Sequence, residues 1–301
     1  MKKTITGILG IGAIGSALAA ALYKNKNIEL KYYNRSPRDF IKIKIAGAEY
    51  IYPIDCQTNI AAGQQLDWLI ICLKEYHFEN AKEWLGKLIG ASTKVAVIRN
   101  GLRLKEPVLE FCEEKNIVEC MVDCPVQPVG DGFYEQYKMP KITIPKSGIS
   151  APFLQLFDKK YISVNIVADF KTAAWEKLCG SAALGAILCL SGETCWIFND
   201  KKIREIYKNI LTEAVEVAIA DGAIIPGNFI GKMLARLKEY PPEKGSSMLT
   251  DRRNGRPVEL GAKNGAISRL GALYGIKTPL NDLACSLLQY TNKDGLGRQK
   301  K

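Results

Sequence analysis

Histidine is almost missing from this sequence: His77 is the single one among 301 residues. Zinc sites and cysteine nucleophiles usually rely on a histidine partner, and Cys120 and Cys124 have none near them in the sequence. We therefore expect no metal site, no Cys-His catalytic pair and no chemical role for His77. The nine cysteines are an odd number spread along the chain, which favours reduced thiols in a cytoplasmic protein.

Long apolar runs and dense basic segments are also scarce. After Tyr23 we find no second apolar run of membrane-spanning length, so we expect no membrane partner. Basic residues outnumber acidic ones by 42 to 31, for a net charge of +11, but they are scattered. Because no basic helix is interleaved with aromatic residues, we expect anionic small molecules rather than nucleic acid as partners.

What the sequence does contain, near its start, is a strand, a glycine-rich turn and a helix. An apolar run from Ile5 leads into Gly10, Gly12 and Gly15, which have G-x-G-x-x-G spacing, and small apolar residues follow at helical density. A second strand then ends at Asn34. This order predicts a dinucleotide-binding βαβ unit, whose glycines permit a tight turn, approach of the pyrophosphate and close helix packing. The helix N-terminus would face the phosphates.

An alternative for the same stretch is a secretory signal or a membrane span. Lys2 and Lys3 precede the apolar run, which reaches Tyr23. However, three spaced glycines are unusual in the apolar core of a signal peptide, and the run passes directly into a second strand. We therefore favour the nucleotide-binding fold.

Asn34 and Arg35 stand at the end of the second strand, where NAD-preferring sites usually place a carboxylate for the ribose 2′-hydroxyl. A carboxylate would repel a 2′-phosphate, whereas a guanidinium can bind one and can stack on adenine. The pair therefore favours NADP(H). The alternative is an ordinary solvated arginine at a strand end.

Polar residues follow two later strands of the predicted parallel sheet. Lys74 comes after the apolar run 66–73, and Asn100-Gly101 comes after the run 93–98. Because the carboxyl ends of parallel strands form the ligand crevice, Lys74 is placed to reach a phosphate or the substrate, and Asn100 to bridge nicotinamide and substrate. A solvated lysine and a plain turn-forming Asn-Gly pair are the alternatives.

The other elements predicted for the first half are helices at 37–45, 78–89 and 104–115, and strands at 50–52, 118–122, 132–134 and 142–144.

The pattern changes near residue 167, after which helices replace the alternation of strands and helices. We therefore predict two domains, residues 1–166 and 167–301. The first has a Rossmann-type α/β fold with a mostly parallel sheet, and the second is all-α. The helices predicted for the second domain span 169–190, 204–220, 227–237, 258–274 and 279–290.

Lys177 lies within the first long helix of the second half and shares a face with Ser181. Gly180 and Gly185 are unusual inside a helix and would let another group approach closely. A lysine held against apolar neighbours can donate a proton. A lysine that snorkels to solvent is the simpler interpretation of this helix taken alone.

Pro257 and Glu259 fit the first and third positions of the helix predicted at 258–274. The helix dipole favours a carboxylate there, which would explain Glu259 without any functional role. Gly275 would then end the helix as a left-handed cap, and Pro279 would begin the next helix.

Taken together, several motifs resemble the ketopantoate reductase (2-dehydropantoate 2-reductase) family over nearly the whole chain. The motifs are the glycine loop 10–15, Asn100-Gly101, Trp175-Glu-Lys177-Leu and, most specific, Ser246-Ser-Met-Leu-Thr-Asp … Gly255-Arg-Pro-Val-Glu259 … Asn264-Gly-Ala-Ile … Gly275-Ile-Lys-Thr-Pro279. The family implies a Rossmann domain joined to a helical domain like the C-terminal domain of 6-phosphogluconate dehydrogenase, with the active site between them. It also implies NADPH-dependent reduction of a 2-keto acid to a 2-hydroxy acid, as in pantothenate biosynthesis.

The resemblance implies a role for each matching residue. Lys177 would donate the proton to the carbonyl oxygen and stabilise the developing alkoxide. Asn100 and Glu259 would complete the catalytic set, and Ser247, Ser181 and Lys177 would bind the substrate. The cofactor NADPH would be held by Gly10, Gly12, Ala13, Ile14, Gly15, Asn34, Arg35, Lys74, Asn100 and Glu259.

The sequence departs from the family pattern in the expected substrate pocket. The family has asparagine where this chain has Ser181 and Gly185, and a further substrate asparagine near Cys195 is missing. Serine reaches less far than asparagine, so each lost contact would weaken ketopantoate binding by about 1–3 kcal/mol. We therefore expect a reductase whose substrate is a different, more apolar 2-keto acid.

Two other functions fit the same fold. A non-catalytic protein would use the scaffold to sense or sequester NADP(H), and would bind NADPH without oxidising it. A related opine-type dehydrogenase would turn over in the oxidative direction or need an amine co-substrate. For the leading function we expect a small-molecule 2-keto acid as the partner and allow for a homodimer.

Overall fold

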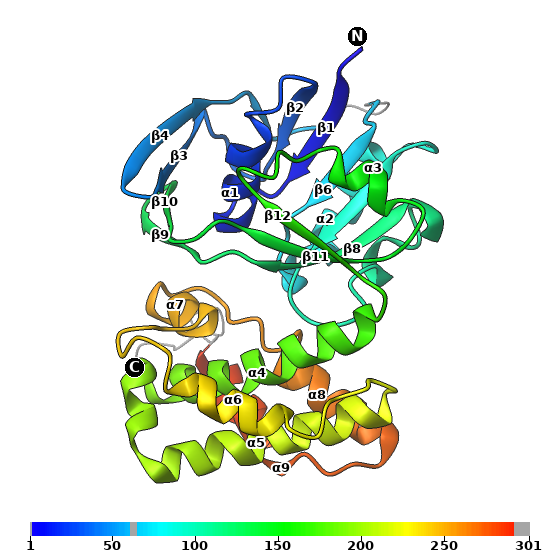
Figure 1. Ribbon diagram of the computed structural model, residues 1–301. Helices are drawn as coiled ribbons and strands as arrows, with labels where there is room; N and C mark the ends of the chain where they lie inside the picture. Colours follow the sequence, from blue (N-terminus) through cyan, green and yellow to red (C-terminus); the bar gives the residue numbers. More distant parts are fainter. Residues whose placement is uncertain (1, 61–64, 292–301) are drawn as a thin grey trace, which may run out of the picture. The chain divides into compact units, whose positions relative to one another are not determined.

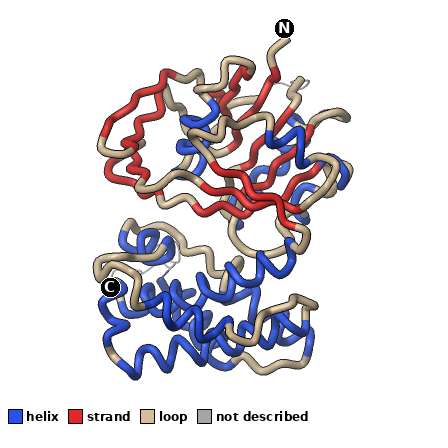
Figure 2. The backbone as a smooth tube through the Cα atoms, viewed as in Figure 1, coloured by secondary structure: helices blue, strands red, loops and turns tan. Residues whose placement is uncertain are grey.

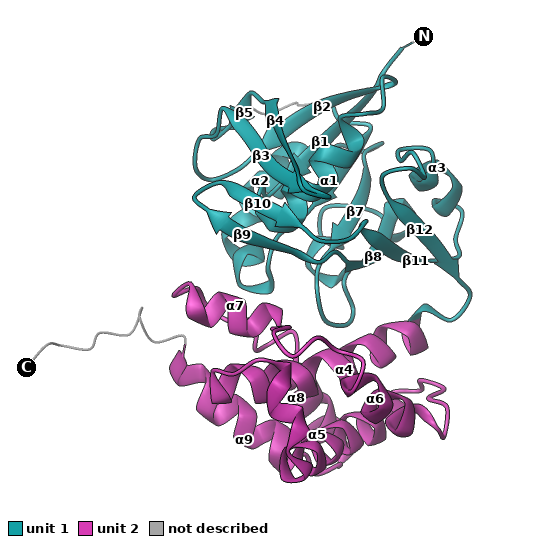
Figure 3. Cartoon of the chain, turned by 60° about the vertical axis from the view of Figure 1, so that its left-hand side comes forward, with its two compact units in different colours: residues 1–170 teal, residues 171–301 magenta. Residues whose placement is uncertain are grey.

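A computed structural model describes residues 2–60 and 65–291 (Figure 1). The chain divides into two compact units, unit 1 at residues 1–170 and unit 2 at residues 171–301 (Figure 3); the sequence placed the division at 166/167. All the described strands belong to unit 1, and unit 2 consists of helices and loops (Figure 2). The predicted order of an α/β fold followed by an all-α fold is confirmed.

Unit 1 is built on an eight-stranded sheet. Its strands are β1 (Thr4–Leu9), β2 (Ile28–Tyr33), β5 (Cys56–Gln57), β6 (Trp68–Ile71), β7 (Lys94–Ile98), β8 (Ile117–Asp123), β11 (Lys141–Pro145) and β12 (Ser163–Val167). Their order is β12-β11-β8-β7-β6-β1-β2-β5, and the six strands from β8 to β5 are parallel. β11 runs antiparallel to β8. β1 therefore lies between β2 and β6, as a dinucleotide-binding unit requires.

Three helices, α1 (Ala13–Leu22), α2 (Phe78–Leu88) and α3 (Ser150–Leu154), cover the faces of this sheet. Alternate residues of each strand point to opposite faces, so the sheet has two cores. Ile8 and Ile70 belong to the core that includes α1. Leu9 and Ile71 belong to the core that includes α2.

A second, smaller sheet packs against α1 from the other side (Figure 1). Its strands, in order, are β4 (Ala48–Pro53), β3 (Phe40–Ile45), β10 (Phe133–Gln136) and β9 (Val126–Gly130). Every residue of α1 from Gly15 to Leu22 is buried, because the helix is enclosed by sheets on two sides. Its alanines keep the helix thin enough for this packing. The first apolar stretch is thus the centre of unit 1.

Two predicted helices of unit 1 are wrong. The segment at 37–45 contains strand β3, and the segment at 104–115 forms two short 3-10 turns, η2 (Glu106–Val108) and η3 (Glu114–Asn116). Pro107 explains the second error, because it lacks the N–H that an α-helix starting at 104 would use in its first hydrogen bond. Strands β5, β9 and β12 were not predicted.

Unit 2 is organised around the long helix α4 (Phe170–Ser191). The other elements are η4 (Cys195–Asn199), α5 (Lys201–Ala220), α6 (Phe229–Leu237), α7 (Ser247–Arg253), α8 (Asn264–Tyr274) and α9 (Pro279–Leu288). Contrary to expectation, α4 is long and apolar enough to cross a membrane by length and composition alone. Because 67% of its apolar window is buried inside the protein, the interior of unit 2 accounts for its composition.

The helix predicted at 258–274 begins six residues late, at Asn264. Residues 256–260 are an irregular segment followed by a turn. Glu259 is therefore not in a helix, and the prediction that a helix dipole explains it is wrong. The predicted ends hold, because Gly275 has φ +70° as a left-handed cap and Pro279 is the first residue of α9.

Candidate active site

The glycine loop of unit 1 joins β1 to α1, and its three glycines meet different surroundings. Gly10 has φ +94°, and a Cβ there would lie 2.8 Å from the Cys72 carbonyl oxygen. A Cβ on Gly15 would lie 2.0 Å from the Gly10 carbonyl oxygen. Around Gly12, by contrast, no described atom lies within 4 Å of where a Cβ would be. Two of the glycines are therefore required by the protein itself, while Gly12 leaves one face of the loop open.

This loop fits the pyrophosphate of a dinucleotide. Gly12 is the N-cap of α1, no side chain caps the helix, and its first turn has no acidic residue. The first N–H groups of a helix carry partial positive charge and need acceptors, which a phosphate supplies. The open face at Gly12 lies beside them and leaves room for such a group.

Asn34 ties the loop to the end of β2. Its side-chain oxygen accepts a hydrogen bond from the Ile11 N–H at 3.3 Å, and its amide donates to the Ser36 carbonyl oxygen at 2.9 Å. The neighbouring Arg35 is exposed, and it forms no ion pair with any residue in 2–60 or 65–291. Asn34 thus holds the loop in place, while the guanidinium beside it is available to an anionic ligand.

Lys74 and Asn100 lie at the same edge of the sheet, because they follow the carboxyl ends of β6 and β7. Both are half-buried. Gly101 has φ +99°, as the turn after Asn100 requires. His77 lies at the strand-to-helix junction between β6 and α2. Burial raises the pKa of the Cys124 thiol, near this edge, to about 12, so it is not a thiolate nucleophile.

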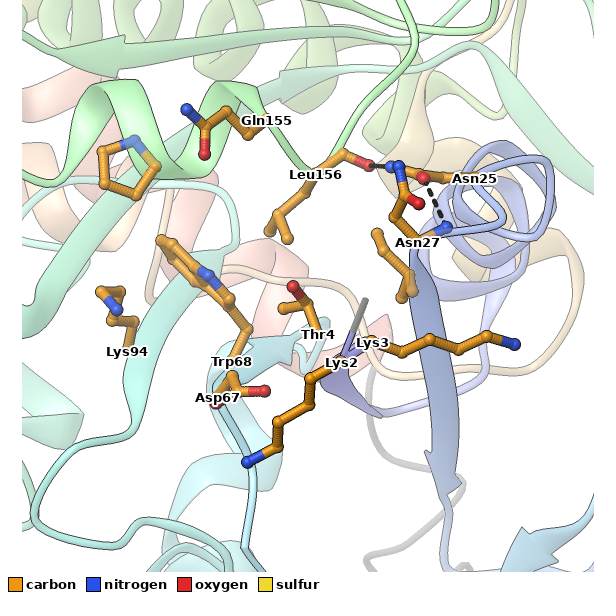
Figure 4. Close-up of a pocket in the computed structure, with 12 residues that line it drawn as sticks. Lys2, Lys3, Thr4, Asn25, Asn27, Asp67, Trp68, Lys94, Gln155 and Leu156 are labelled. Atoms are coloured by element: carbon orange, nitrogen blue, oxygen red, sulfur yellow. Dashed lines mark hydrogen bonds between the residues drawn. The ribbon is translucent and has the colours of Figure 1, made fainter.

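A cavity of about 360 Å³ lies at the opposite edge of the same sheet (Figure 4). The first residues of β1, β2, β6 and β7 line this cavity, so it lies at the amino ends of the parallel strands. No residue predicted for the active site lines it. Charged and polar side chains around it include Lys2, Lys3, Asn25, Asp67, Trp68 and Lys94.

In unit 2, α4 holds Lys177 and Ser181. Lys177 is half-buried, and Trp175 two residues before it is fully buried. The Trp175 indole donates to Asp221 at 2.9 Å, which ties this part of α4 to the end of α5. The Ser181 hydroxyl donates to the Leu178 carbonyl oxygen of its own helix at 3.3 Å. Lys177 therefore extends from a rigid, well-anchored turn of helix.

Ser247 is the first residue of α7, and several contacts fix α7 on the end of α4. Ser246 caps α7 by accepting from the Leu249 N–H at 3.1 Å. Arg252 donates to the carbonyl oxygens of Cys189 and Leu190, and Arg253 donates to that of Gly192 at 2.7 Å. Arg252 thus satisfies two of the last carbonyls of α4, and Arg253 bonds the residue that follows the helix.

Gly180 and Gly185 are filled by methionines of the same chain. A Cβ on Gly180 would lie 2.5 Å from the Met233 methyl carbon. A Cβ on Gly185 would lie 2.6 Å from the Met248 sulfur, and 3.6 Å from the Lys263 ammonium nitrogen. The space beside Gly185, for which the resemblance implies an asparagine, is thus occupied by a methionine and a lysine rather than left empty.

The structure brings the predicted residues together in two groups. Those of the cofactor site, except Glu259, lie along one edge of the unit 1 sheet. In unit 2, Lys177 and Ser181 belong to α4, whereas Ser247 and Glu259 belong to the segment 246–263; Lys177 precedes Gly185 by two helical turns, or about 12 Å. Glu259 is buried, with 6% of its surface exposed. The sequence analysis did not single out Lys263. Its only sign in the sequence is that it is a charged residue within the motif 246–279, the most specific part of the family resemblance.

Metal chemistry finds no support in the described parts of the chain. No three histidine, cysteine, aspartate or glutamate residues gather there in a way that could hold an ion. All nine cysteines are free thiols.

The sequence matches known families along most of its length. Residues 6–148 match the family described as "Ketopantoate reductase PanE/ApbA", and residues 169–292 match "Ketopantoate reductase PanE/ApbA C terminal". The 2-dehydropantoate 2-reductase of Mycobacterium tuberculosis is 30% identical over 97% of this chain and 99% of its own length. That of Caulobacter vibrioides is 29% identical over 95% and 98%.

Solved structures with the same fold are also found. A dimeric ketopantoate reductase from Staphylococcus aureus aligns with a TM-score of 0.86 and 22% identity, covering 96% of this chain and 99% of that one. A ternary structure of D-mandelate dehydrogenase with NADH and anilino(oxo)acetate aligns with a TM-score of 0.85 and 20% identity, covering 97% and 99%.

Proposed function

Because the chain belongs to the ketopantoate reductase family, we propose that it is an oxidoreductase that reduces a 2-keto acid to a 2-hydroxy acid, with ketopantoate as the first candidate substrate. The named relatives along its full length support this reaction. The observation that carries the proposal is the open face at Gly12 beside an uncapped helix N-terminus. That arrangement suits the pyrophosphate of a nicotinamide dinucleotide.

For the cofactor we propose NADPH rather than NADH. Asn34 and Arg35 stand where a carboxylate would select NADH, and Arg35 is an exposed cation without an ion-pair partner among the described residues. A structure of D-mandelate dehydrogenase, which shares the fold, contains NADH. The fold therefore does not by itself select NADPH, and the proposal depends on the residues at the end of β2.

In the proposed reaction, NADPH supplies a hydride to the carbonyl carbon of the keto acid. Lys177 donates a proton to the carbonyl oxygen, and its charge stabilises the alkoxide as it develops. Ser247 and Ser181 bind the substrate, Asn100 orients it together with the nicotinamide, and Glu259 orients the reacting groups. Domains are assigned accordingly: residues 1–166 bind NADP and 167–301 bind the substrate.

The proposal is tested by following NADPH oxidation with a panel of 2-keto acids that includes ketopantoate. Lys177→Met should lower kcat by about 10²–10⁴-fold while the Kd for NADPH stays unchanged, because proton donation is lost without altering the cofactor site. Exposed Lys232 provides the control, since Lys232→Met removes an equal charge from α6. Binding of NADPH without oxidation by any keto acid would instead establish the non-catalytic sensor.

Cofactor choice has its own test. Arg35→Ala should raise the Kd for NADPH by about tenfold or more and leave the Kd for NADH unchanged, because only NADPH has the 2′-phosphate. Lys3→Ala is the matched control, since it removes one positive charge at the opposite edge of the same sheet. Equal effects of the two substitutions on NADPH would show that only net charge matters.

A further inference from the structure

Buried charges are concentrated in one short segment of the protein. Among the residues that the structure describes, the buried charged side chains are Asp251, Glu259 and Lys263. Charged side chains are seldom buried without a specific reason. Glu259 is already placed in the proposed active site, whereas Lys263 has no role in the family resemblance.

Lys263 links three elements of unit 2. It is the N-cap residue of α8, and only 3% of its surface is exposed. Its ammonium nitrogen lies 3.1 Å from the hydroxyl oxygen of Ser247, the first residue of α7. The same nitrogen lies 3.6 Å from the position of a Cβ on Gly185 in α4. A Cβ at Gly185 would touch the ammonium at ordinary contact distance, so a side chain longer than that of alanine would compete with the ammonium for this space.

The hydrogen bond between Lys263 and Ser247 has a fixed direction. An ammonium group has three donors and no acceptor, so the Ser247 oxygen must accept. The hydroxyl hydrogen of Ser247 is then left to donate to another group. Accepting from a charged donor polarises the hydroxyl and strengthens the bond that it donates. Ser247 is exposed, so its hydrogen can reach a ligand while Lys263 stays buried behind it.

We propose that Lys263 is a positioning residue that turns Ser247 into a hydrogen-bond donor for the carboxylate of the 2-keto acid. The buried charge behind the serine selects anionic substrates over neutral ones. This inference rests on the proposed function and replaces the expected apolar pocket at Gly185 with one that has an ammonium group behind its serine. It explains why this chain manages without the asparagine that the family has at Gly185.

The test compares a 2-keto acid that the wild type reduces with the methyl ester of the same acid. Lys263→Met should lower kcat/KM for the acid by about tenfold or more, mainly through KM, and leave that for the ester nearly unchanged. The ratio of acid to ester then falls. Damage to folding would lower both values together, so the ratio separates the two effects. The control Lys232→Met should leave the ratio as it is in the wild type.

Ser247→Ala supplies a second test in case Lys263→Met does not fold, because Ser247 is exposed and its hydroxyl is lost without opening the interior. It should lower the acid-to-ester ratio by a similar factor, and Lys263→Met added to it should lower the ratio little further. An unchanged ratio in Ser247→Ala, or in folded Lys263→Met, would overturn the inference. A wild type that reduces no 2-keto acid would overturn the proposed function instead.

Discussion

Gly12 in the loop of unit 1 and the two glycines of α4 in unit 2 have opposite surroundings. Gly12 is the N-cap of α1, and the other two lie inside α4. At Gly12 the nearby space is free of described atoms, whereas Gly180 and Gly185 are filled by Met233 and Met248. A glycine in the sequence thus predicts a close contact, but it does not predict whether the contacting group is a ligand or another part of the protein.

The distinction matters because a glycine's surroundings decide how the protein responds to one added methyl group there. Where the protein's backbone occupies the space, folding should suffer. Where the space is open, folding should tolerate the methyl group and ligand binding should suffer. Where a flexible side chain occupies it, the outcome depends on whether that side chain can move.

The largest effect is expected at Gly15. A Cβ there would lie 2.0 Å from the Gly10 carbonyl oxygen, which is backbone and cannot turn away. Gly15→Ala should therefore lower the free energy of unfolding by about 3 kcal/mol or more, measured by urea denaturation. A loss below about 1 kcal/mol would mean that the loop can rearrange. Contact with backbone would then no longer distinguish Gly15 from the other glycines.

Gly12→Ala should separate binding from stability. The backbone at Gly12, with φ −86° and ψ −161°, suits alanine, and no described atom is in the way. The free energy of unfolding should change by less than about 0.5 kcal/mol, while the Kd for NADPH rises by about tenfold or more because the methyl group meets the pyrophosphate. Calorimetric titration with NADPH checks this, and unaltered affinity would place the cofactor elsewhere.

The smallest effects, of opposite sign, are expected in α4. Alanine favours a helix over glycine by about 1 kcal/mol. At Gly180 the obstacle is the end of half-buried Met233, which can move aside, so Gly180→Ala should stabilise unit 2 by up to about 1 kcal/mol. At Gly185 the obstacle is Met248, only 1% exposed, so Gly185→Ala should destabilise it by about 1 kcal/mol net. Thermal unfolding of both variants tests this. A stabilised Gly185→Ala would contradict the assignment of Met248 as immobile, and a destabilised Gly180→Ala would contradict the assignment of Met233 as mobile.

The sequence allowed prediction of the features that local patterns control. The βαβ unit at the start of unit 1 could be predicted because the strand, the spaced glycines and the helix follow one another without interruption. The segment Phe40-Ile-Lys-Ile-Lys-Ile45 alternates apolar and charged residues, which is a strand pattern. It was misinterpreted as helix because Pro37 precedes it, a position at which helices often begin.

The unit 2 site was less predictable because its contacts depend on tertiary structure. Glu259 fitted a helix start on spacing alone, yet the chain turns after Leu260, and the Gly265 N–H donates to the Leu260 carbonyl oxygen at 2.9 Å. Lys263 and Ser247 are far apart in the sequence and meet only because α7 packs on the end of α4. No spacing rule connects such residues.

The enclosure of α1 between two sheets has a consequence for folding during synthesis on the ribosome. Strands β3 and β4 of the small sheet follow α1 closely in the sequence, but strands β9 and β10, which also cover that side of the helix, are translated only about a hundred residues later. At typical synthesis rates this leaves that side only partly covered for on the order of ten seconds. During that interval the nascent chain offers a short alanine- and leucine-rich segment to molecular chaperones.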